Sequence, residues 1–322
     1  MVDDTFTPST GIPVNVMLVD PNALLNAVVA GNGPDVVIST DSWNPVNYAL
    51  RHAVEDLTQF DDLQEVLDQF YPSAYAAFSF NGGLYALPET QLCSILFYRS
   101  DILEEYGLSV PETWDDLIAM LPTIQGANMS VGIPYPDIAA PNLSSYYAML
   151  YQLGGALYND SATHTTINSE AGVQAFGRYT SLYNDYGLPT IFDFVSRFRS
   201  GEMPLGIFEF NALTVSAPEI RGLWDIAILP GTSRTAEDGS TYVDHSGHSQ
   251  GACCMMIATD SETTKQNAWQ FMKWWTSTDA QVRFGREIKP SWVRPHATPP
   301  RISPPSSSFH GQKHNWQSSA NR

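Results

Sequence analysis

Short apolar runs alternate along the chain with stretches in which apolar residues recur every three or four positions, and Gly or Pro separates many of them. Apolar runs of about four to eight residues predict strands, whereas the longer period predicts helices. A helix over Asn22–Ala30 between the first two strands forms a strand–helix–strand unit, which favours a parallel sheet and an α/β fold. Strands are expected at Val14–Val19, Asp35–Ser39, Ile95–Tyr98, Val131–Tyr135, Leu205–Phe208, Trp224–Leu229 and Cys253–Ala258.

Capping residues set several helix boundaries. Gly107 ends a helix over Asp101–Tyr106, because glycine readily takes the left-handed conformation that follows a helix. Thr113 is a good N-cap for the next helix, and the acidic residues behind it suit the helix dipole. Further helices are expected over Glu55–Tyr75 in pieces, then over Leu143–Leu153, Glu170–Tyr186 (capped by Asn168 or Ser169) and Thr263–Trp275 (capped by Ser261), with a new start at Thr278–Asp279.

Composition narrows the class of protein. The 322 residues are 43% hydrophobic and 12% aromatic, which is enough for two packed lobes. The formal net charge of −18 argues against nucleic acid and anionic membranes as partners, since both require clusters of Lys and Arg. No apolar run is long enough to span a bilayer, and the chain as given shows no signal peptide.

The cysteines and histidines do not predict a metal centre. Cys93, Cys253 and Cys254 have neither disulfide-framework nor metal-site spacing, so we expect them to be small buried residues. His245 and His248 lie three apart in a Gly/Ser loop without other evident ligands. We therefore predict no metal and no cofactor.

Four motifs occur in the same order as in one protein family. They are Leu84–Leu117 (LYALPETQLCSILFYRSDILEEYGLSVPETWDDL), Ala30–Ile38 (AGNGPDVVI), Phe198–Phe208 (FRSGEMPLGIF) and Ala268–Phe284 (AWQFMKWWTSTDAQVRF). Together they resemble the extracellular solute-binding proteins, similar to maltose-binding protein, that serve ABC importers of sugars. The resemblance runs from about Thr10 to Glu287.

The resemblance implies a two-lobed, type II periplasmic-binding-protein-like α/β fold whose lobes close on a ligand. Residues 1–100 and 247–278 would form the first lobe, and residues 101–246 the second. The chain would cross between them near Tyr98–Asp101 and after the strands that end at Phe208 and Leu229.

Both ends of the chain depart from the family pattern. The resemblance implies an earlier strand lying between Val14–Val19 and Asp35–Ser39, and without it neighbouring strands lose a ladder partner, so we expect marginal stability. Residues 286–322 hold six of the 16 Lys and Arg residues, with many prolines and no apolar period, which predicts an aberrant, disordered tail. Re-reading a back-translation of Ser291–Arg322 one base earlier gives a family-like continuation, which indicates a reading-frame slip.

A sugar site needs aromatic faces for the C–H surfaces of the ring and planar polar groups for its hydroxyls. Trp43 and Asn44 qualify because they follow a buried strand, at the end where ligands bind in open α/β sheets. The other candidates are Glu89, Thr90 and Gln91 on the first lobe, Ser145, Tyr146, Tyr147, Glu209, Phe210 and Asn211 on the second, and Ser249 and Gln250 in the loop before the Cys253 strand. Core packing is the alternative for Trp43, Tyr146 and Tyr147, and a solvated loop position is the alternative for Glu209.

The resemblance therefore implies a non-enzymatic protein that binds an oligosaccharide outside the cell and delivers it to the permease subunits of an ABC transporter. We expect a monomer, anchored at the cell surface as a lipoprotein in its full-length form. Binding of an oligopeptide or a polyamine is one alternative. A glycoside hydrolase that pairs Glu89 with Glu209 is another, although no catalytic motif such as a nucleophile elbow or P-loop occurs.

Overall fold

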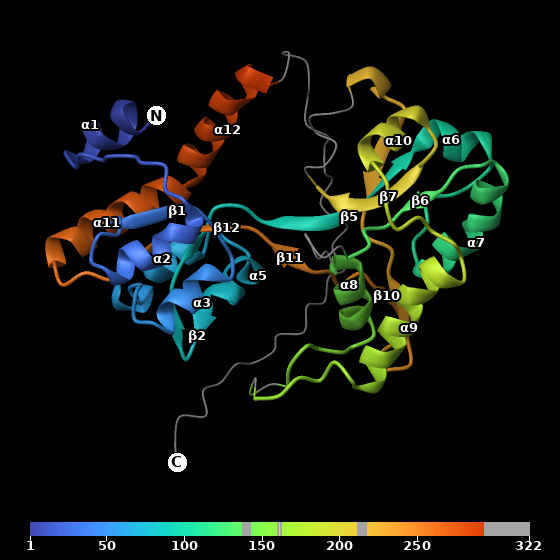
Figure 1. Ribbon diagram of the computed structural model, residues 1–322, viewed down its shortest axis with the longest axis horizontal. Coiled ribbons are helices and arrows are strands. Elements are labelled where there is room, and N and C mark those ends of the chain that lie inside the picture. Colours follow the sequence, from blue (N-terminus) through green and yellow to red (C-terminus); the bar gives the residue numbers. More distant parts are fainter. Residues whose placement is uncertain (137–142, 160, 162, 211–217, 293–322) are drawn as a thin grey trace.

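The computed structural model describes residues 1–136, 143–159, 161, 163–210 and 218–292. They form two lobes that lie side by side and are joined by extended segments (Figure 1). Each lobe has its own apolar core: one draws its buried residues from positions 6–87 and 253–275, the other from positions 96–229. We call these lobe 1 and lobe 2. This α/β architecture agrees with the two-lobed fold predicted from the sequence.

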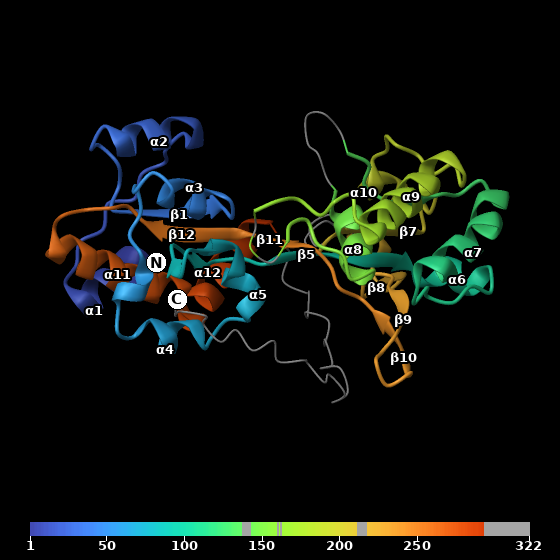
Figure 2. The ribbon, with the colours of Figure 1, turned by 90° about the horizontal axis from the view of Figure 1, so that it is seen from below.

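Lobe 1 is built on a three-stranded antiparallel sheet, in which β12 (Ala252–Met256) lies between β1 (Val36–Asp41) and β4 (Leu87–Pro88). Helices α2 and α3 lie on one side of it and α4 and α11 on the other (Figure 2). The helices are α1 (Thr7–Thr10), α2 (Pro21–Val29), α3 (Asn44–Ala49), α4 (Leu63–Leu67), α5 (Pro72–Tyr75), α11 (Glu262–Thr276) and α12 (Thr278–Trp292). Short turns η1 (Val2–Phe6), η2 (Leu57–Gln59) and η3 (Ala76–Phe78) and a hairpin of β2 (Ser79–Phe80) and β3 (Gly83–Leu84) complete the lobe.

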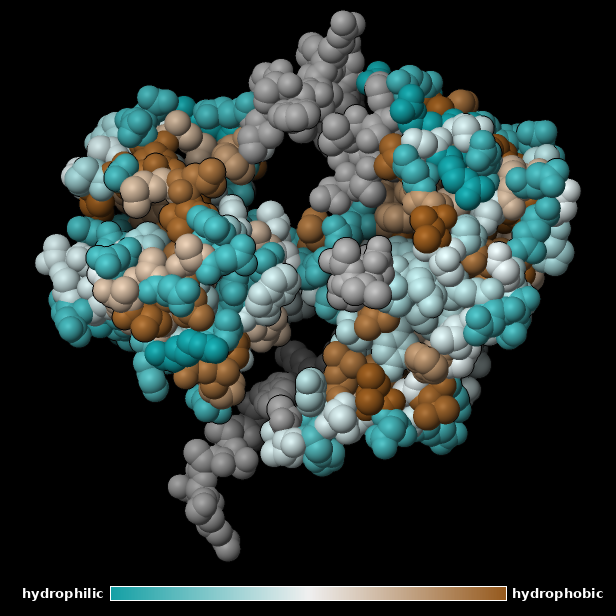
Figure 3. All heavy atoms as spheres, viewed as in Figure 1, coloured by the Kyte–Doolittle hydropathy of each residue, from teal (hydrophilic) through white to brown (hydrophobic). Residues whose placement is uncertain are grey.

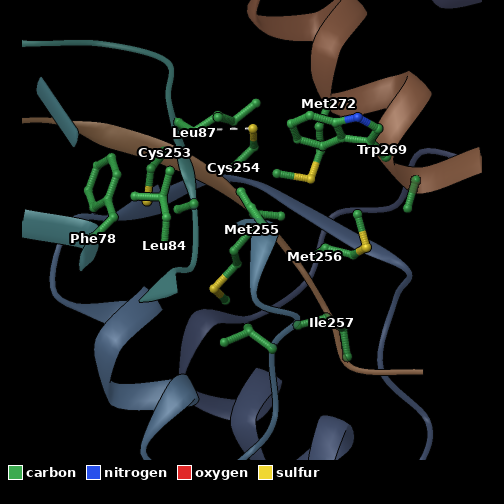
Figure 4. Packing of buried hydrophobic residues seen from close by; sticks show 14 of the residues in the cluster. Phe78, Leu84, Leu87, Cys253, Cys254, Met255, Met256, Ile257, Trp269 and Met272 are labelled. Carbon is green, nitrogen blue, oxygen red and sulfur yellow. Dashed lines mark hydrogen bonds between the residues drawn. The ribbon is translucent and has the colours of Figure 1, made fainter. Parts of the chain in front are cut away.

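Strand β12 forms the centre of the lobe 1 core (Figure 4). All four residues of Cys253–Met256 are buried, because strands flank β12 and helices cover both of its faces. The Cys254 thiol donates to the Leu87 carbonyl at 3.7 Å across the sheet. The prediction of small buried cysteines is confirmed for Cys253 and Cys254 but is wrong for Cys93, which is exposed where its strand leaves lobe 1.

Lobe 2 contains a five-stranded sheet in the order β11 (Ser249–Gln250), β5 (Leu92–Arg99), β7 (Leu205–Glu209), β6 (Val131–Gly132), with β8 (Trp224–Ala227) also paired to β5. Only the β6–β7 pair is parallel among the ladders that the structure describes. A hairpin of β9 (Thr232–Thr235) and β10 (Thr241–Asp244) is added at one side. The helices are α6 (Ser100–Glu105), α7 (Trp114–Gly126), α8 (Ser144–Gln152), α9 (Glu170–Asn184) and α10 (Phe194–Ser200), with a turn η4 (Pro218–Ile220).

Arg99, which is 7% exposed, holds the end of β5 inside lobe 2 through hydrogen bonds. Its guanidinium donates from Nε and Nη2 to the Asp101 carboxylate, at 2.8 and 2.7 Å. Its Nη1 donates to the carbonyls of Phe198 and Arg199, at 2.9 and 3.2 Å, where α10 ends and its carbonyls need donors. The sequence division placed residues up to 100 in the first lobe, but β5 pairs with β7 and β8 and so belongs to the sheet of lobe 2.

Predicted helix caps are confirmed at three helices. The Thr113 hydroxyl accepts from the backbone N–H of Asp116, whose carboxylate in turn accepts from the Thr113 N–H, so α7 begins with a capping box. The hydroxyls of Ser169 and Ser261 also accept a backbone N–H in the first turn, so these residues cap α9 and α11. Gly107 takes the left-handed conformation after α6, with φ +65°.

The strand predicted at Val14–Val19 is wrong. No backbone hydrogen bond joins residues 13–19 to any described strand, and β1 pairs only with β12 in the described part of the chain. The side chains of Val16, Met17 and Leu18 are 65%, 63% and 103% exposed. An apolar run becomes a strand only where a neighbouring strand accepts its backbone groups, and none of the described strands does so here.

The predicted disordered tail is also corrected in part. Helix α12 continues to Trp292, so residues 286–292 are helical, and Phe284 packs edge-on against Trp275 of α11 at 5.1 Å between ring centroids. Residues 293–322 lie outside the described part of the chain. Among the described helices, none combines the length and apolar character that crossing a bilayer requires.

A half-buried carboxylate supports an irregularity in β1. The register with β12 shifts between Val37 and Thr40, and Ser39 there adopts φ +55°, an unfavourable backbone angle for a residue with a side chain. The Ser39 N–H and hydroxyl donate to the two carboxylate oxygens of Glu89, at 2.9 and 3.1 Å. Burial raises the pKa of Glu89, while these bonds and the neighbouring indole of Trp275 oppose the rise.

One buried amide connects four parts of lobe 2. Gln152, at the end of α8, is fully buried, and its Oε1 accepts from Trp114 Nε1 at 2.8 Å and from the Thr232 hydroxyl at 3.0 Å. Its Nε2 donates to the carbonyls of Pro230 and Ser246, both at 3.1 Å. All of the hydrogen-bonding capacity of this amide is therefore used, as burial demands.

We predict that Gln152→Leu lowers the free energy of unfolding by about 3 kcal/mol, because buried donors and acceptors on the four partners lose their bonds. Urea denaturation followed by circular dichroism measures the change. Gln174→Ala on the exposed face of α9 is the matched control and should stay within about 0.5 kcal/mol of the wild type. Equal effects of the two substitutions would contradict this account of Gln152.

We predict that Glu89→Gln has a pH-dependent effect on stability. Folding raises the pKa of Glu89, so this group favours the folded state below the carboxyl's ordinary pKa of about 4.3, and that contribution is lost as pH rises through the folded-state pKa. The unfolding free energy of the wild type relative to the Gln variant should therefore increase as pH falls from neutral towards about 4.3. Denaturant titrations at several pH values test this, with Glu104→Gln on α6 as control. A constant difference across pH would refute it.

Candidate functional site

Two antiparallel segments connect the lobes in the described structure. Backbone N–H groups of Glu89 and Thr90 donate to the Ala252 carbonyl at 2.9 and 3.1 Å, and the Ala252 N–H donates to the Thr90 hydroxyl at 2.8 Å. One step further, Ser249 and Gln250 of β11 pair with Cys93 and Leu92 of β5. Figures 1 and 2 show β5 and β11 extending between the lobes. We call residues 89–93 and 249–252 the hinge.

Glycine is required at one point of the hinge. A Cβ on Gly251 would lie 1.9 Å from the Thr90 carbonyl oxygen, far inside van der Waals contact. The two crossing segments approach this closely only because residue 251 has no side chain. The close approach places the exposed side chains of Thr90 and Gln91 on one segment beside those of Ser249 and Gln250 on the other.

Figure 3 shows open space between the two lobes. Several predicted residues of lobe 2 bond the hinge segments. Glu209 ends β7, and its Oε1 accepts from Gln250 Nε2 at 2.6 Å. Phe210 follows with 41% of its surface exposed, and its N–H donates to the Cys93 carbonyl at 3.1 Å. Thus Glu209, Phe210 and Gln250 meet at the hinge, whereas Asn211 lies outside the described residues.

The lobe 1 side of the hinge is bordered by the end of β1. Asp41 at that end pairs with Ala252, so the residues that follow it begin next to the hinge. Trp43 is 64% exposed, which leaves its indole free to stack on a ligand. The Asn44 amide donates to the Thr40 hydroxyl at 2.8 Å. Core burial, the alternative for Trp43, is therefore excluded.

The three neighbouring residues predicted on α8 differ in their surroundings. Ser145 and Tyr146 are 1% and 4% exposed in the lobe 2 core, which argues against direct contact with a ligand. Their helix buries one face against α9, where Tyr146 lies edge-on to Phe176. Tyr147 points elsewhere: it is half-buried, and its ring centroid lies 5.3 Å from that of His248.

Glu89 has a structural role in this arrangement. Both of its carboxylate oxygens accept hydrogen bonds from Ser39, so it supports β1 within lobe 1. Glu209 instead bonds an exposed amide at the hinge. The two carboxylates predicted as a possible hydrolase pair therefore have different partners and surroundings.

Two residues at the hinge were not among the predicted ligand residues. His248 immediately precedes β11, and Cys93 is exposed on β5. The sequence signal that could have identified them as candidates is that they lie next to, or two residues from, the predicted residues Gln91, Ser249 and Gln250. In the described part of the chain, no group of three or more His, Cys, Asp or Glu side chains is arranged to hold a metal ion.

Two cavities lie away from these residues. One of about 460 Å³ in lobe 1 is bordered by His52, Asp56, Asn81 and Tyr85 among others, and one of about 580 Å³ in lobe 2 is bordered by Tyr158, Asn159, Glu170 and Gln174 among others. Neither cavity is bordered by a predicted ligand residue.

Comparison with known proteins places this architecture in a family. The family model described as bacterial extracellular solute-binding protein matches residues 2–288. A maltotriose-binding protein of Pyrococcus abyssi is 24% identical over 271 residues, which cover 81% of this chain and 55% of that protein. This chain thus spans little more than half the length of that relative.

Solved structures agree on the fold. The sugar-binding protein MalE of Xanthomonas citri superposes with a TM-score of 0.72 at 20% identity, covering 89% of this chain and 73% of the other. The cyclic α-maltosyl-1,6-maltose binding protein of Arthrobacter globiformis also gives 0.72, at 17% identity and with 88% and 72% covered. The family match over most of the chain, together with the two-lobed fold, shows that this protein belongs to the bacterial extracellular solute-binding proteins.

Proposed function

We propose that this protein binds a carbohydrate outside the cell and delivers it, chemically unchanged, to the permease subunits of an ABC importer. The observation that carries the proposal is a set of accessible aromatic and polar side chains on both sides of the two-segment hinge. In lobe 2, Glu209 bonds Gln250, and the Phe210 N–H donates to the Cys93 carbonyl. In lobe 1, the exposed Trp43 follows by two residues the end of β1, which pairs with Ala252. Aromatic faces and planar hydrogen-bonding groups are what a sugar ring requires.

The hinge suits capture by closure. Two short extended segments can bend through a few backbone angles without disturbing either core, and a ligand that contacts both lobes favours the closed arrangement. The relatives support the ligand class, because one is named for maltotriose, and the compared structures are described as a sugar-binding protein and as a cyclic α-maltosyl-1,6-maltose binding protein. We further propose that the protein acts as a monomer, with a lipid-anchored full-length form at the cell surface.

The observed carboxylates do not favour a hydrolase. Glycoside hydrolysis uses two carboxyl groups that flank one glycosidic bond. Glu89 instead uses both oxygens on Ser39, within lobe 1. A polyamine is the second candidate ligand, because the Glu209 carboxylate at the hinge could pair with an organic cation and the exposed Phe210 follows it in sequence.

Isothermal titration of the full chain with maltotriose, raffinose, melibiose and arabinotriose tests the proposal, with spermidine and a tripeptide as further arms. We expect saturable heat with at least one saccharide, and no release of smaller sugars on chromatography. Binding of spermidine or peptide without any saccharide would support the alternative solutes. Released sugar would support the hydrolase.

We predict that Trp43→Ala weakens saccharide binding by about tenfold, because the exposed indole supplies the apolar face on lobe 1. Tyr106→Ala is the matched control, since Tyr106 is 40% exposed just after α6, on the outer side of lobe 2 (Figure 1). Titration calorimetry compares the two variants with the wild type. Unchanged affinity in Trp43→Ala would remove Trp43 from the site.

We predict that Gly251→Ala destabilises the protein by about 1–3 kcal/mol and weakens saccharide binding, because the new methyl group forces the hinge segments apart. Gly177→Ala is an informative control: it lies inside α9 with open space around it, and should stabilise the protein by about 0.5–1 kcal/mol. Thermal melts and titrations with the same saccharide measure both effects. A Gly251→Ala variant that melts and binds like wild type would show that the close approach at Thr90 has no role.

A further inference from the structure

The strongest unassigned feature beside the hinge is the contact between His248 and Tyr147. Their ring centroids lie 5.3 Å apart, with an angle of 48° between the planes. Both side chains are half-buried, so each packs on the protein while part of its surface remains accessible. His248 directly precedes Ser249 of β11 and therefore lies within two residues of the Glu209–Gln250 pair.

Lobe 2 holds this pair of rings in a defined position. Tyr147 is on α8, and the same helix ends at Gln152, whose amide donates to the Ser246 carbonyl at 3.1 Å. The Ser246 N–H donates in turn to Asp244 Oδ1 at 2.9 Å. His245 adds a 2.7 Å contact between its Nδ1 and the Leu229 carbonyl. The loop that carries His248 is thus hydrogen-bonded to α8, the helix that carries Tyr147.

The candidate ligand residues near His248 include a carboxylate but no basic side chain. We use the term groove residues for the candidates at or near the hinge, none of which is Lys or Arg: Trp43, Thr90, Gln91, Tyr147, Glu209, Phe210, His248, Ser249 and Gln250. Glu209, by contrast, places a carboxylate at the hinge. Burial lowers the pKa of His248, so its imidazole is neutral at neutral pH and offers one donor and one acceptor. Most basic side chains in the described structure are paired with acids instead: Arg99–Asp101, Arg178–Asp115, Arg197–Glu202, Arg199–Glu219, Arg234–Asp244, Lys265–Glu55, Lys273–Asp62 and Arg283–Glu287.

We propose that His248, held against Tyr147, contacts the ligand and selects an uncharged saccharide over an anionic one. The inference rests on the proposed carbohydrate function. A neutral imidazole bonds sugar hydroxyls in both directions, and the tyrosine ring extends the apolar surface beside it. A uronate or sugar phosphate would bring its charge near Glu209 without a cation among the described groove residues to receive it.

The test is calorimetric titration of the full chain with neutral saccharides (maltotriose, raffinose, melibiose, arabinotriose) and with two anionic ones (trigalacturonate and glucose 6-phosphate). We expect the wild type to bind at least one neutral saccharide and neither anion. His248→Ala should weaken neutral binding about tenfold or more. His248→Lys should narrow the preference for neutral over anionic ligands, which a purely structural role would not do.

Controls separate the possible failures. His164→Ala, an exposed histidine in the hairpin before α9, should bind like wild type, and His248→Asn retains a planar polar group if the alanine variant does not fold. A wild type that binds no saccharide refutes the proposed function, and the inference with it. Saccharide binding that is unchanged in His248→Ala, or equal binding of trigalacturonate by the wild type, refutes the inference alone. If the alanine variant does not fold, the inference is refuted when His248→Lys keeps the same preference for neutral over anionic ligands as His248→Asn.

Discussion

The arrangement of this protein depends on the contact of two extended segments at one point, where the Thr90 carbonyl oxygen faces Gly251. The backbone groups of Glu89, Thr90 and Ala252 bond one another there, and β5 and β11 then continue as a short ladder into lobe 2. A two-stranded connection resists sliding because its hydrogen bonds set the register, yet it can bend. It therefore joins two separate cores while leaving freedom for their relative motion.

The lobes on either side differ in how they support the groove. In lobe 1 a half-buried carboxylate, Glu89, bonds the irregular strand that ends two residues before Trp43. In lobe 2 a buried neutral amide, Gln152, connects a helix, a hairpin and the loop that leads to β11. Both groups are polar and satisfied, and each orders a segment that borders the hinge. Binding residues presented in this way need little reorganisation when a ligand arrives.

In the proposed site, the charges of individual side chains rather than the fold would decide which solutes are preferred. The solute-binding fold accommodates many ligands, so specificity has to come from individual side chains. Here the exposed or half-buried polar groups at the hinge are amides, hydroxyls, one imidazole and the Glu209 carboxylate, while most described basic residues pair with acids elsewhere. Such a surface matches hydroxyl-rich or cationic solutes better than anions.

Sequence alone was sufficient for features that depend on neighbouring residues. The caps at Thr113, Ser169 and Ser261 were predictable because a capping hydroxyl bonds an N–H only three residues away. The motifs at Leu84–Leu117 and elsewhere were enough to indicate the family and its two lobes. Trp43 and Glu209 were also identified as ligand candidates, the first because it follows a buried strand, although their ligand contacts remain predictions.

Long-range partners required the folded chain. Val14–Val19 has the composition of a strand, but a strand exists only where another supplies its hydrogen bonds, and no described strand does. Glu89 and Glu209 look alike in sequence, yet one supports Ser39 and the other holds Gln250, which is 41 positions away. Tyr146 and Tyr147 are adjacent, yet only one reaches His248, because successive residues of a helix face different neighbours. The burial of a residue and its bonding partners depend on which distant segments pack against it, and the neighbouring sequence does not specify those segments.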